Sequence, residues 1–282
     1  MAASLIERAV GHPGWGPRSQ ASAAAPAASR PAARPVAAAA EPTFRPVWRR
    51  LARQGLLTPG TLGSPLAREI GAAKRRLLRH LDLFRQQADA RNTVLVTSAE
   101  PGEGKSFIAL NLALSLALEE QLPVALVDAD PHAPTVARLL DLPSRRGLAD
   151  RLADPDLPLD QLLHLADGLP LSVLDAGDAT ASPARLFGTP AMAALLAELG
   201  QRHAGGLVIL DGPPVLATNE GPVLAHQVAQ TILVAAASQA TEESVASALE
   251  LLDCGERVAL LLNRSRTGGD PGRYARSYES QA

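Results

Sequence analysis

The sequence contains very little cysteine and no long hydrophobic run. Cys254 is the only cysteine among 282 residues, which excludes a disulfide framework and a cysteine-based metal cluster. The six histidines are scattered, without the spacing of a metal site. The longest apolar run, Phe107 to Leu118, is about half the length that a membrane-spanning helix needs. The N-terminus lacks a basic segment followed by an apolar one, so we expect no secretory signal and a cytoplasmic protein.

Lysine is almost absent as well. Of the 27 basic residues only Lys74 and Lys105 are lysines. The formal net charge of −2 gives no overall attraction to a polyanion, so we expect no nucleic-acid partner. With 46% hydrophobic residues, the chain is long enough for one sizeable α/β domain with extensions.

Composition divides the chain into four parts. Residues 1–45 begin with a short amphipathic pattern and continue as an Ala/Pro-rich stretch with little to bury, which predicts a short helix and a disordered linker. Residues 46–91 are helical and basic, with Ser64 as a helix N-cap. The arginine-rich face of this helix is either simply solvated or a surface for a partner or a membrane. Residues 92–266 form the main domain, and residues 267–282 are a glycine-rich, polar tail that we expect to be flexible.

Short apolar runs alternate with helical patterns throughout the main domain. The runs are continuously apolar, which is typical of strands covered on both faces. Helical patterns at 104–119 and 189–203 lie between them. This alternation predicts an α/β fold, a three-layer sandwich with a mostly parallel sheet. The predicted strands are 93–98, 123–130, 171–178, 206–214, 231–238 and 258–265.

The stretch TSAEPGEGKS, residues 97–106, follows the first predicted strand and resembles a phosphate-binding loop. Ala99 stands where the pattern G-x-x-x-x-G-K-[ST] has its first glycine. Such a loop wraps backbone N–H groups around a phosphate at the start of a helix. Gly102 and Gly104 would supply the unusual backbone angles that this requires.

The same loop carries the polar side chains of a nucleotide site. Lys105 would reach the β- and γ-phosphates, and Ser106 would bind Mg²⁺. A glycine turn with an incidental lysine is the alternative, and the scarcity of lysine argues against it. The predicted nucleotide-binding residues of the loop are Pro101, Gly102, Glu103, Gly104, Lys105, Ser106 and Phe107.

Aspartates stand at the ends of two predicted strands. ALVDAD places Asp128 and Asp130 on one face of their strand, and LVILDGPP carries Asp211. The carboxyl ends of parallel strands meet at one edge of a sheet, where metal-binding carboxylates would face the phosphates. We therefore expect Asp211 to interact with Mg²⁺ directly or through another ligand. A turn or cap role is the alternative for each strand end.

Taken in order, these motifs resemble the bacterial tyrosine autokinases (BY-kinases), relatives of the partition and septum-site ATPases. The shared features are a P-loop without its first glycine, a strand ending D-x-D and a strand ending D-x-P-P. Glu100 replaces the extra lysine of the partition branch and argues against that branch. SLIERAV (4–10), GLLTPG (55–60), KRRLL (74–78), GLAD (147–150) and NR (263–264) resemble the branch associated with exosortase gene clusters.

The resemblance covers most of the chain and implies a P-loop NTPase fold of the partition-ATPase and BY-kinase type. The implied activity is that of an ATP-dependent protein-tyrosine autokinase which uses Mg²⁺ and regulates exopolysaccharide polymerisation and export. The implied partners are a membrane polysaccharide co-polymerase or chain-length regulator and further copies of the chain, which would phosphorylate one another. The protein would then be peripheral at the inner membrane through its partner.

The resemblance also implies roles for single residues. Asp128 and Asp211 would hold Mg²⁺ together with Ser106. Lys105 and the three aspartates would form the catalytic group, with Asp128 or Asp130 accepting the tyrosine proton and Asp130 favoured. Asn263 would contact the adenine.

The two tyrosines of the chain, Tyr274 and Tyr278, both lie in the polar tail. We expect them to be the phosphoacceptors; the alternative is that they are incidental. The sequence departs from the BY-kinase pattern in this sparse tail and at His132, where an Arg is usual. The stretch REIGAAK also lacks an Arg associated with ring assembly. Two other functions are therefore weighed: an ATPase switch that binds a membrane co-polymerase with little or no kinase activity, and a nucleotide-binding scaffold without turnover.

Overall fold

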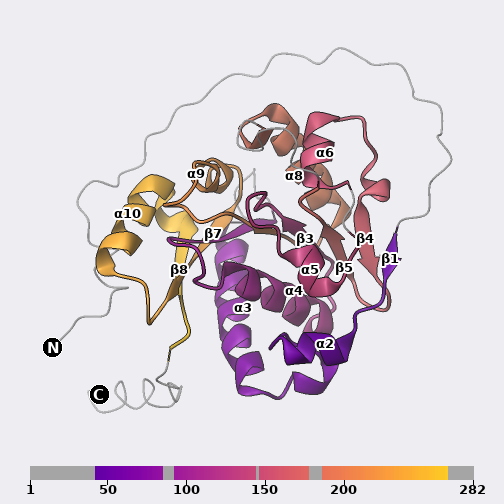
Figure 1. Ribbon diagram of the computed structural model, residues 1–282, viewed down its shortest axis with the longest axis horizontal. Coiled ribbons are helices and arrows are strands. Elements are labelled where there is room, and N and C mark those ends of the chain that lie inside the picture. Colours follow the sequence, from indigo (N-terminus) through magenta and orange to yellow (C-terminus); the bar gives the residue numbers. More distant parts are fainter. Residues whose placement is uncertain (1–41, 85–91, 144–145, 178–185, 266–282) are drawn as a thin grey trace. The chain divides into compact units, whose positions relative to one another are not determined.

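The computed structural model describes residues 42–84, 92–143, 146–177 and 186–265. Within them the chain forms one eight-stranded sheet with the order β1-β4-β5-β3-β6-β2-β7-β8 (Figure 1). The strands are β1 (Thr43–Phe44), β2 (Thr93–Ser98), β3 (Val124–Asp128), β4 (Leu163–Ala166), β5 (Leu171–Leu174), β6 (Leu207–Asp211), β7 (Gln230–Ala236) and β8 (Val258–Asn263).

Neighbouring strands are parallel except for the antiparallel pair β4 and β5. The prediction of a mostly parallel α/β fold is confirmed. Each of the six predicted strands is present, although all except β2 end two to four residues earlier than predicted. β1 and β4 were not predicted, because segments of two and four residues carry too little pattern to stand out from the surrounding loops.

Helices cover both faces of the sheet. The described helices are α2 (Trp48–Arg53), α3 (Pro65–Phe84), α4 (Lys105–Glu119), α5 (Val136–Leu140), α6 (Leu148–Ala153), α8 (Pro190–Arg202), α9 (Glu220–Ala225) and α10 (Glu242–Leu252). Short 3-10 turns lie at Pro59–Thr61, Leu159–Gln161 and Gly255–Arg257. None of the helices within the described ranges is long and apolar enough to cross a membrane.

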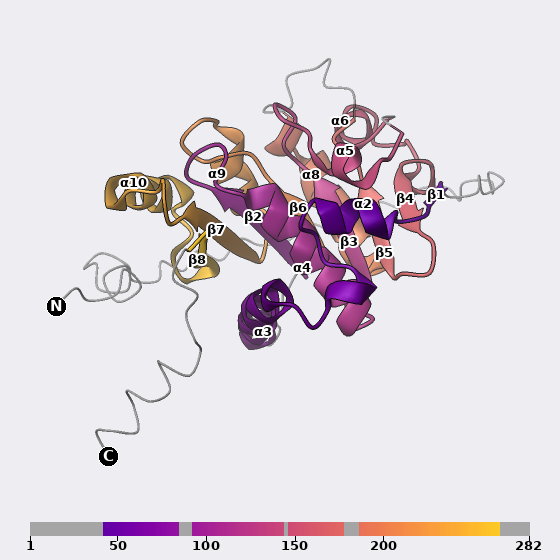
Figure 2. The ribbon, with the colours of Figure 1, turned by 60° about the horizontal axis from the view of Figure 1, so that its bottom comes forward.

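The strands divide their side chains between two hydrophobic clusters. Val94 and Val96 of β2 pack with α2, α3 and α4 on one face, whereas Leu95 packs with α6, α8 and α10 on the other. Figures 1 and 2 show the two sets of helices on opposite sides of the sheet. The central strands are therefore buried on both faces, which explains why their sequences are continuously apolar.

The segment before the main domain packs against α4. α3 begins after Ser64, whose hydroxyl accepts a hydrogen bond from Ala67 N at 3.2 Å. Lys74 is buried between α3 and α4, where it forms ion pairs with Glu119 and Glu120. The segment 1–45, predicted to be a short helix and a disordered linker, lies outside the described residues except for 42–45, where Thr43–Phe44 forms β1. The predicted flexible tail, 267–282, lies wholly outside them.

Candidate functional site

The predicted phosphate loop joins the carboxyl end of β2 to the start of α4, near the centre of the sheet. Ala99 is fully buried and is not among the described residues with a positive φ. The position thus needs no glycine, and a small side chain fits the core there. Gly102 and Gly104 have φ values of 82° and 100°, conformations that glycine adopts without strain.

Glu103 fastens the loop to the neighbouring strand. Its side chain is buried, and its carboxylate accepts hydrogen bonds from Glu100 N at 2.8 Å and from Ala236 N, at the end of β7, at 3.1 Å. The carboxylate therefore faces the protein interior, and only the backbone of Glu103 remains to contact a ligand.

Asn263 holds the same loop from the end of β8. Its Nδ2 donates to the carbonyl of Glu103 at 2.8 Å, and its Oδ1 accepts from Arg264 N at 2.9 Å. A Cβ at Gly104 would lie 2.2 Å from Asn263 Nδ2, so no larger residue fits at Gly104. The structure thus places Asn263 against the loop backbone, with both ends of its amide already bonded.

Lys105, the first residue of α4, points at the carboxyl ends of the strands. Its Nζ lies 2.7 Å from Oδ2 of Asp130. Burial alone would lower the pKa of Lys105, but neighbouring carboxylates outweigh burial and raise it above the usual lysine value. Those carboxylates belong to Asp211, Asp130 and Asp128.

Asp128, the last residue of β3, uses its carboxylate to hold backbone in place. It accepts hydrogen bonds from Thr135 N at 2.8 Å, Val136 N at 2.9 Å and Asp130 N at 3.2 Å. Burial raises its pKa to about 6 even though these bonds favour the charged form.

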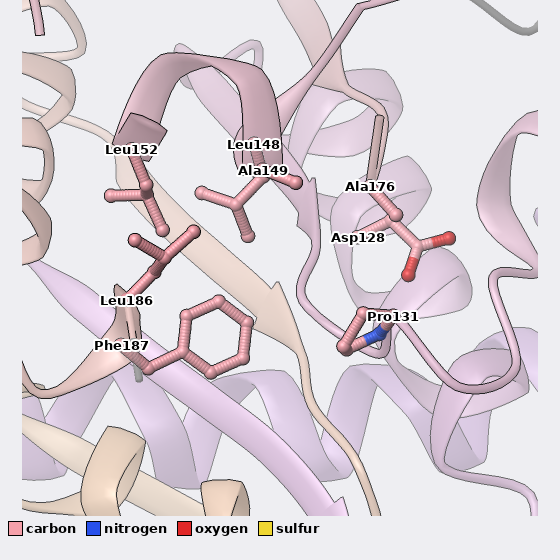
Figure 3. Close-up of a pocket in the computed structure, with 8 residues that line it drawn as sticks. All are labelled: Asp128, Pro131, Leu148, Ala149, Leu152, Ala176, Leu186 and Phe187. Atoms are coloured by element: carbon pink, nitrogen blue, oxygen red, sulfur yellow. The ribbon is translucent and has the colours of Figure 1, made fainter. Parts of the chain in front are cut away.

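The surroundings of Asp128 explain the strength of this burial effect. Figure 3 shows the residue at the edge of a small pocket, with its carboxylate pointing away from the apolar side chains. The pocket has no room for a water molecule, so the charge gains no solvation from that side. Its lining consists of Asp128, Pro131, Leu148, Ala149, Leu152, Ala176, Leu186 and Phe187.

Asp211, the last residue of β6, lies opposite Asp128 in register and differs from it in its bonding. It is fully buried, and neither carboxylate oxygen has a hydrogen-bond partner within the described parts of the chain. Burial raises its pKa to about 7, although the nearby Lys105 ammonium and Ser106 hydroxyl lower it. A buried carboxylate with two unused oxygens beside a serine hydroxyl has the chemistry of a magnesium site, so these residues fit Mg²⁺.

A cleft of about 870 Å³ opens over the phosphate loop. This volume lies within the range of small-molecule sites. Of the three predicted aspartates, Asp130 lines the cleft, whereas Asp128 and Asp211 lie behind its surface. The loop residues that line it are Pro101, Gly102, Gly104, Lys105, Ser106 and Phe107.

The cleft also contains polar residues that sequence reasoning missed. His132 Nε2 lies 2.8 Å from Oε1 of the buried Glu220, so the loop after β3 is linked to the start of α9. Arg138 and Arg264 also line the cleft. Only a weak sign of this pair is visible beforehand, namely His132 at a position where the BY-kinase pattern has an Arg. The predicted acceptors Tyr274 and Tyr278 lie outside the described residues.

A ParA-type family model, whose description is NUBPL iron-transfer P-loop NTPase, matches residues 89–166. These residues contain the phosphate loop and Asp128. The chain carries a ParA-family P-loop NTPase domain. Its curated relatives include tyrosine-protein kinase YwqD of Bacillus subtilis, 33% identical over 160 residues, or 57% of this chain and 66% of that protein. Tyrosine-protein kinase etk of Escherichia coli K12 is 29% identical over 178 residues, or 63% of this chain.

Solved structures that are similar to this chain include kinase domains. The VpsO kinase domain superposes with a TM-score of 0.57 at 29% identity, covering 69% of this chain and 98% of that one. The chimerical protein CapA2B2, at 21% identity and a TM-score of 0.65, shares the fold and covers 80% of this chain and 94% of its own. The chain spans 66% of the length of YwqD and 24% of that of etk.

Proposed function

We propose that this protein is an ATP-dependent protein-tyrosine kinase that phosphorylates tyrosines of its own C-terminal tail. The observation that carries the proposal is that the carboxylates of Asp128, Asp130 and Asp211 gather around Lys105, which lines the cleft over the phosphate loop together with Asp130. The similarity to proteins named tyrosine-protein kinases supports the choice of tyrosine as acceptor.

The loop would bind the phosphates of ATP through its backbone amides and Lys105. To reach the γ-phosphate, the Lys105 ammonium would exchange its contact with Asp130 for one with phosphate oxygens. Ser106 and Asp211 would hold Mg²⁺, with Asp128 positioning the end of β3. When bound, Mg²⁺ neutralises charge on the triphosphate.

In the transfer step the tyrosine oxygen forms a bond to the γ-phosphorus while the bond from phosphorus to the β–γ bridging oxygen breaks. The products are phosphotyrosine and ADP, and the phenol proton must go to a base. Asp130 is the better placed of the two predicted bases because it lines the cleft. Both carboxylates accept backbone hydrogen bonds, Asp128 from three amides and Asp130 from those of His132 and Ala133 through Oδ1. Oδ2 of Asp130 pairs with Lys105 and would be released when the ammonium moves to the phosphate.

The proposed biological setting rests on the resemblance to the BY-kinases. The proposed role is regulation of exopolysaccharide polymerisation and export, beside a membrane polysaccharide co-polymerase and with other copies of this chain as substrates. In this setting the protein would be peripheral at the inner membrane, held there by its partner.

Incubation of the purified full chain with Mg·ATP, followed by phosphotyrosine detection, tests the kinase. We expect a signal in the wild type, none in Lys105→Met, and none in the Tyr274→Phe/Tyr278→Phe double variant. Phosphate release without phosphotyrosine would contradict the kinase and support the alternative function of an ATPase switch. Nucleotide binding without turnover would support the other alternative, a nucleotide-binding scaffold.

A further inference from the structure

A row of arginines covers the outer face of α3. The arginine stripe consists of Arg68, Arg75, Arg76 and Arg79, all of them exposed. Their spacing of 7, 8 and 11 residues from Arg68 places them on one side of a helix. The opposite side, with Ile70, Leu77 and Leu81, is buried in the core. Packing against α4 therefore fixes the direction in which the stripe faces.

The arginines of the stripe are not neutralised by ion pairs with described side chains. None of its four guanidinium groups forms an ion pair with a residue in the described ranges. Arg68 and Arg79 donate only to backbone carbonyls, those of Gly63 and Arg75. The helix contains two acids, Glu69 and Asp82, against five arginines and lysines. Positive charge on this face is thus available to an external anion.

Charge is also unevenly divided along the chain. Residues 42–84 contain nine basic and two acidic residues, a formal charge of +7, which leaves −9 for the rest of a chain whose total is −2. The exposed Arg49 and Arg53 of α2 add to the positive segment. Figures 1 and 2 both show α2 and α3 on the same side of the sheet. Arg45, Arg50 and Lys74 are ion-paired with acids from the rest of the chain, so the positive charge of this side lies mainly on the exposed arginines of α2 and α3.

We propose that the arginine stripe binds the anionic headgroups of a lipid bilayer. A membrane surface contacts one side of a protein, which matches the one-sided charge, and guanidinium groups pair well with phosphate oxygens. The choice of a bilayer rests on the proposed function, because a membrane partner would bring this domain close to lipid. The binding itself needs no phosphoryl transfer, since no stripe residue lines the cleft.

Vesicle co-sedimentation of the full chain tests the proposal. We expect binding to vesicles of phosphatidylglycerol and phosphatidylcholine, weak binding to pure phosphatidylcholine, and loss of binding at ~1 M salt, where the screening length is about 3 Å. Arg76→Gln/Arg79→Gln should lower the partition coefficient by roughly 30-fold, and Arg76→Glu/Arg79→Glu should lower it further.

A control of equal charge separates the stripe from net charge. Arg146→Glu/Gln201→Glu/Ala246→Glu changes the charge by −4, as Arg76→Glu/Arg79→Glu does, at exposed positions away from α3. We expect this control to bind nearly as well as the wild type. Equal loss in both variants would overturn the proposal, and so would unchanged binding of Arg76→Glu/Arg79→Glu.

Two further results would assign the stripe to another partner and overturn the proposal. One is stripe-dependent self-association in sedimentation velocity without vesicle binding. The other is stripe-dependent binding of duplex DNA in preference to vesicles. Phosphotyrosine formation in solution should be unchanged in Arg76→Glu/Arg79→Glu. The wild type could bind vesicles through the stripe and yet show no kinase activity. That result would contradict the proposed function but support membrane binding by the stripe.

Discussion

Asp128 and Asp211 lie opposite each other on adjacent strands, yet their carboxylates serve different purposes. Asp128 is bonded to three backbone amides, whereas Asp211 has no hydrogen-bond partner among the described residues. Asp211 costs stability, because burial penalises its charge more than the nearby Lys105 ammonium and Ser106 hydroxyl compensate for it. Such a cost is common where a residue is kept for ligand binding.

Asp211→Asn should therefore stabilise the protein in the absence of Mg·ATP while reducing turnover at least ~100-fold. The folded pKa of about 7 lies above the ordinary value of 3.8, so the folded state binds the extra proton between these values. Wild-type stability attributable to Asp211 consequently falls as pH rises from about 4 to about 7, by up to about 4 kcal/mol. The stabilisation by Asn should be small at pH 4 and full at pH 8, as measured by urea unfolding.

Asp128→Asn is the matched control. It removes an acceptor from backbone amides that are already bonded, so it should destabilise the fold by about 1–3 kcal/mol. A stabilising effect of the same size in both variants would contradict the distinction between the two aspartates.

Glu103 provides a second test among single residues. Glu103→Gln replaces an acceptor with a group that can donate, at a position that faces two backbone N–H groups. The phosphate loop should lose its fixed shape, and nucleotide affinity in calorimetry should fall by roughly tenfold. Glu100→Gln, at the exposed neighbouring acid, should bind nucleotide like the wild type. Equal affinities in all three proteins would show that the hydrogen bonds of the Glu103 carboxylate do not contribute to nucleotide binding.

Among the secondary-structure elements, the junction of α3 with α4 depends on the ion pairs of the buried Lys74 with the partly exposed Glu119 and Glu120. Lys74→Met leaves the carboxylate of Glu119 without its ammonium partner, so we expect a loss of about 2 kcal/mol in the free energy of unfolding. Arg76→Met, at an exposed site of the same helix, should change it by less than about 0.5 kcal/mol. Adding Glu119→Gln to Lys74→Met should recover part of the loss; additive losses would exclude the coupling.

Elements whose signal is local could be predicted from the sequence. The six buried strands and the phosphate loop each carry their pattern within a few residues, and the structure has them in the predicted order. β1 and β4 were missed because they are short, and β4 also reverses direction against β5. The hydrogen bond between Glu103 and Ala236 N was not predicted, because the two residues are 133 positions apart and no pattern within the loop indicates that contact.

The candidate site could be predicted only in part from the sequence. Residue types at strand ends indicated which aspartates would gather, since parallel strands end at one edge. They did not indicate that Asp128 would accept hydrogen bonds from three backbone amides, or that Asn263 would bind the loop. Those outcomes depend on side-chain orientation and on the path of the chain after each strand.

Taken as one molecule, the chain combines the cleft over the phosphate loop with a tail that contains both of its tyrosines. Tyr274 and Tyr278 are the only tyrosines, so any autophosphorylation on tyrosine must modify the tail. A cleft on one copy and a tail on another would make phosphorylation depend on protein concentration. The initial rate per molecule should rise with concentration if transfer occurs between copies and stay constant if it occurs within one copy.

Intact-protein mass spectrometry after incubation with Mg·ATP tests the central claim most directly. The account predicts one or two added phosphate groups in the wild type, none in Lys105→Met and none in Tyr274→Phe/Tyr278→Phe. An unmodified wild-type mass, with ATP bound or hydrolysed, would contradict it.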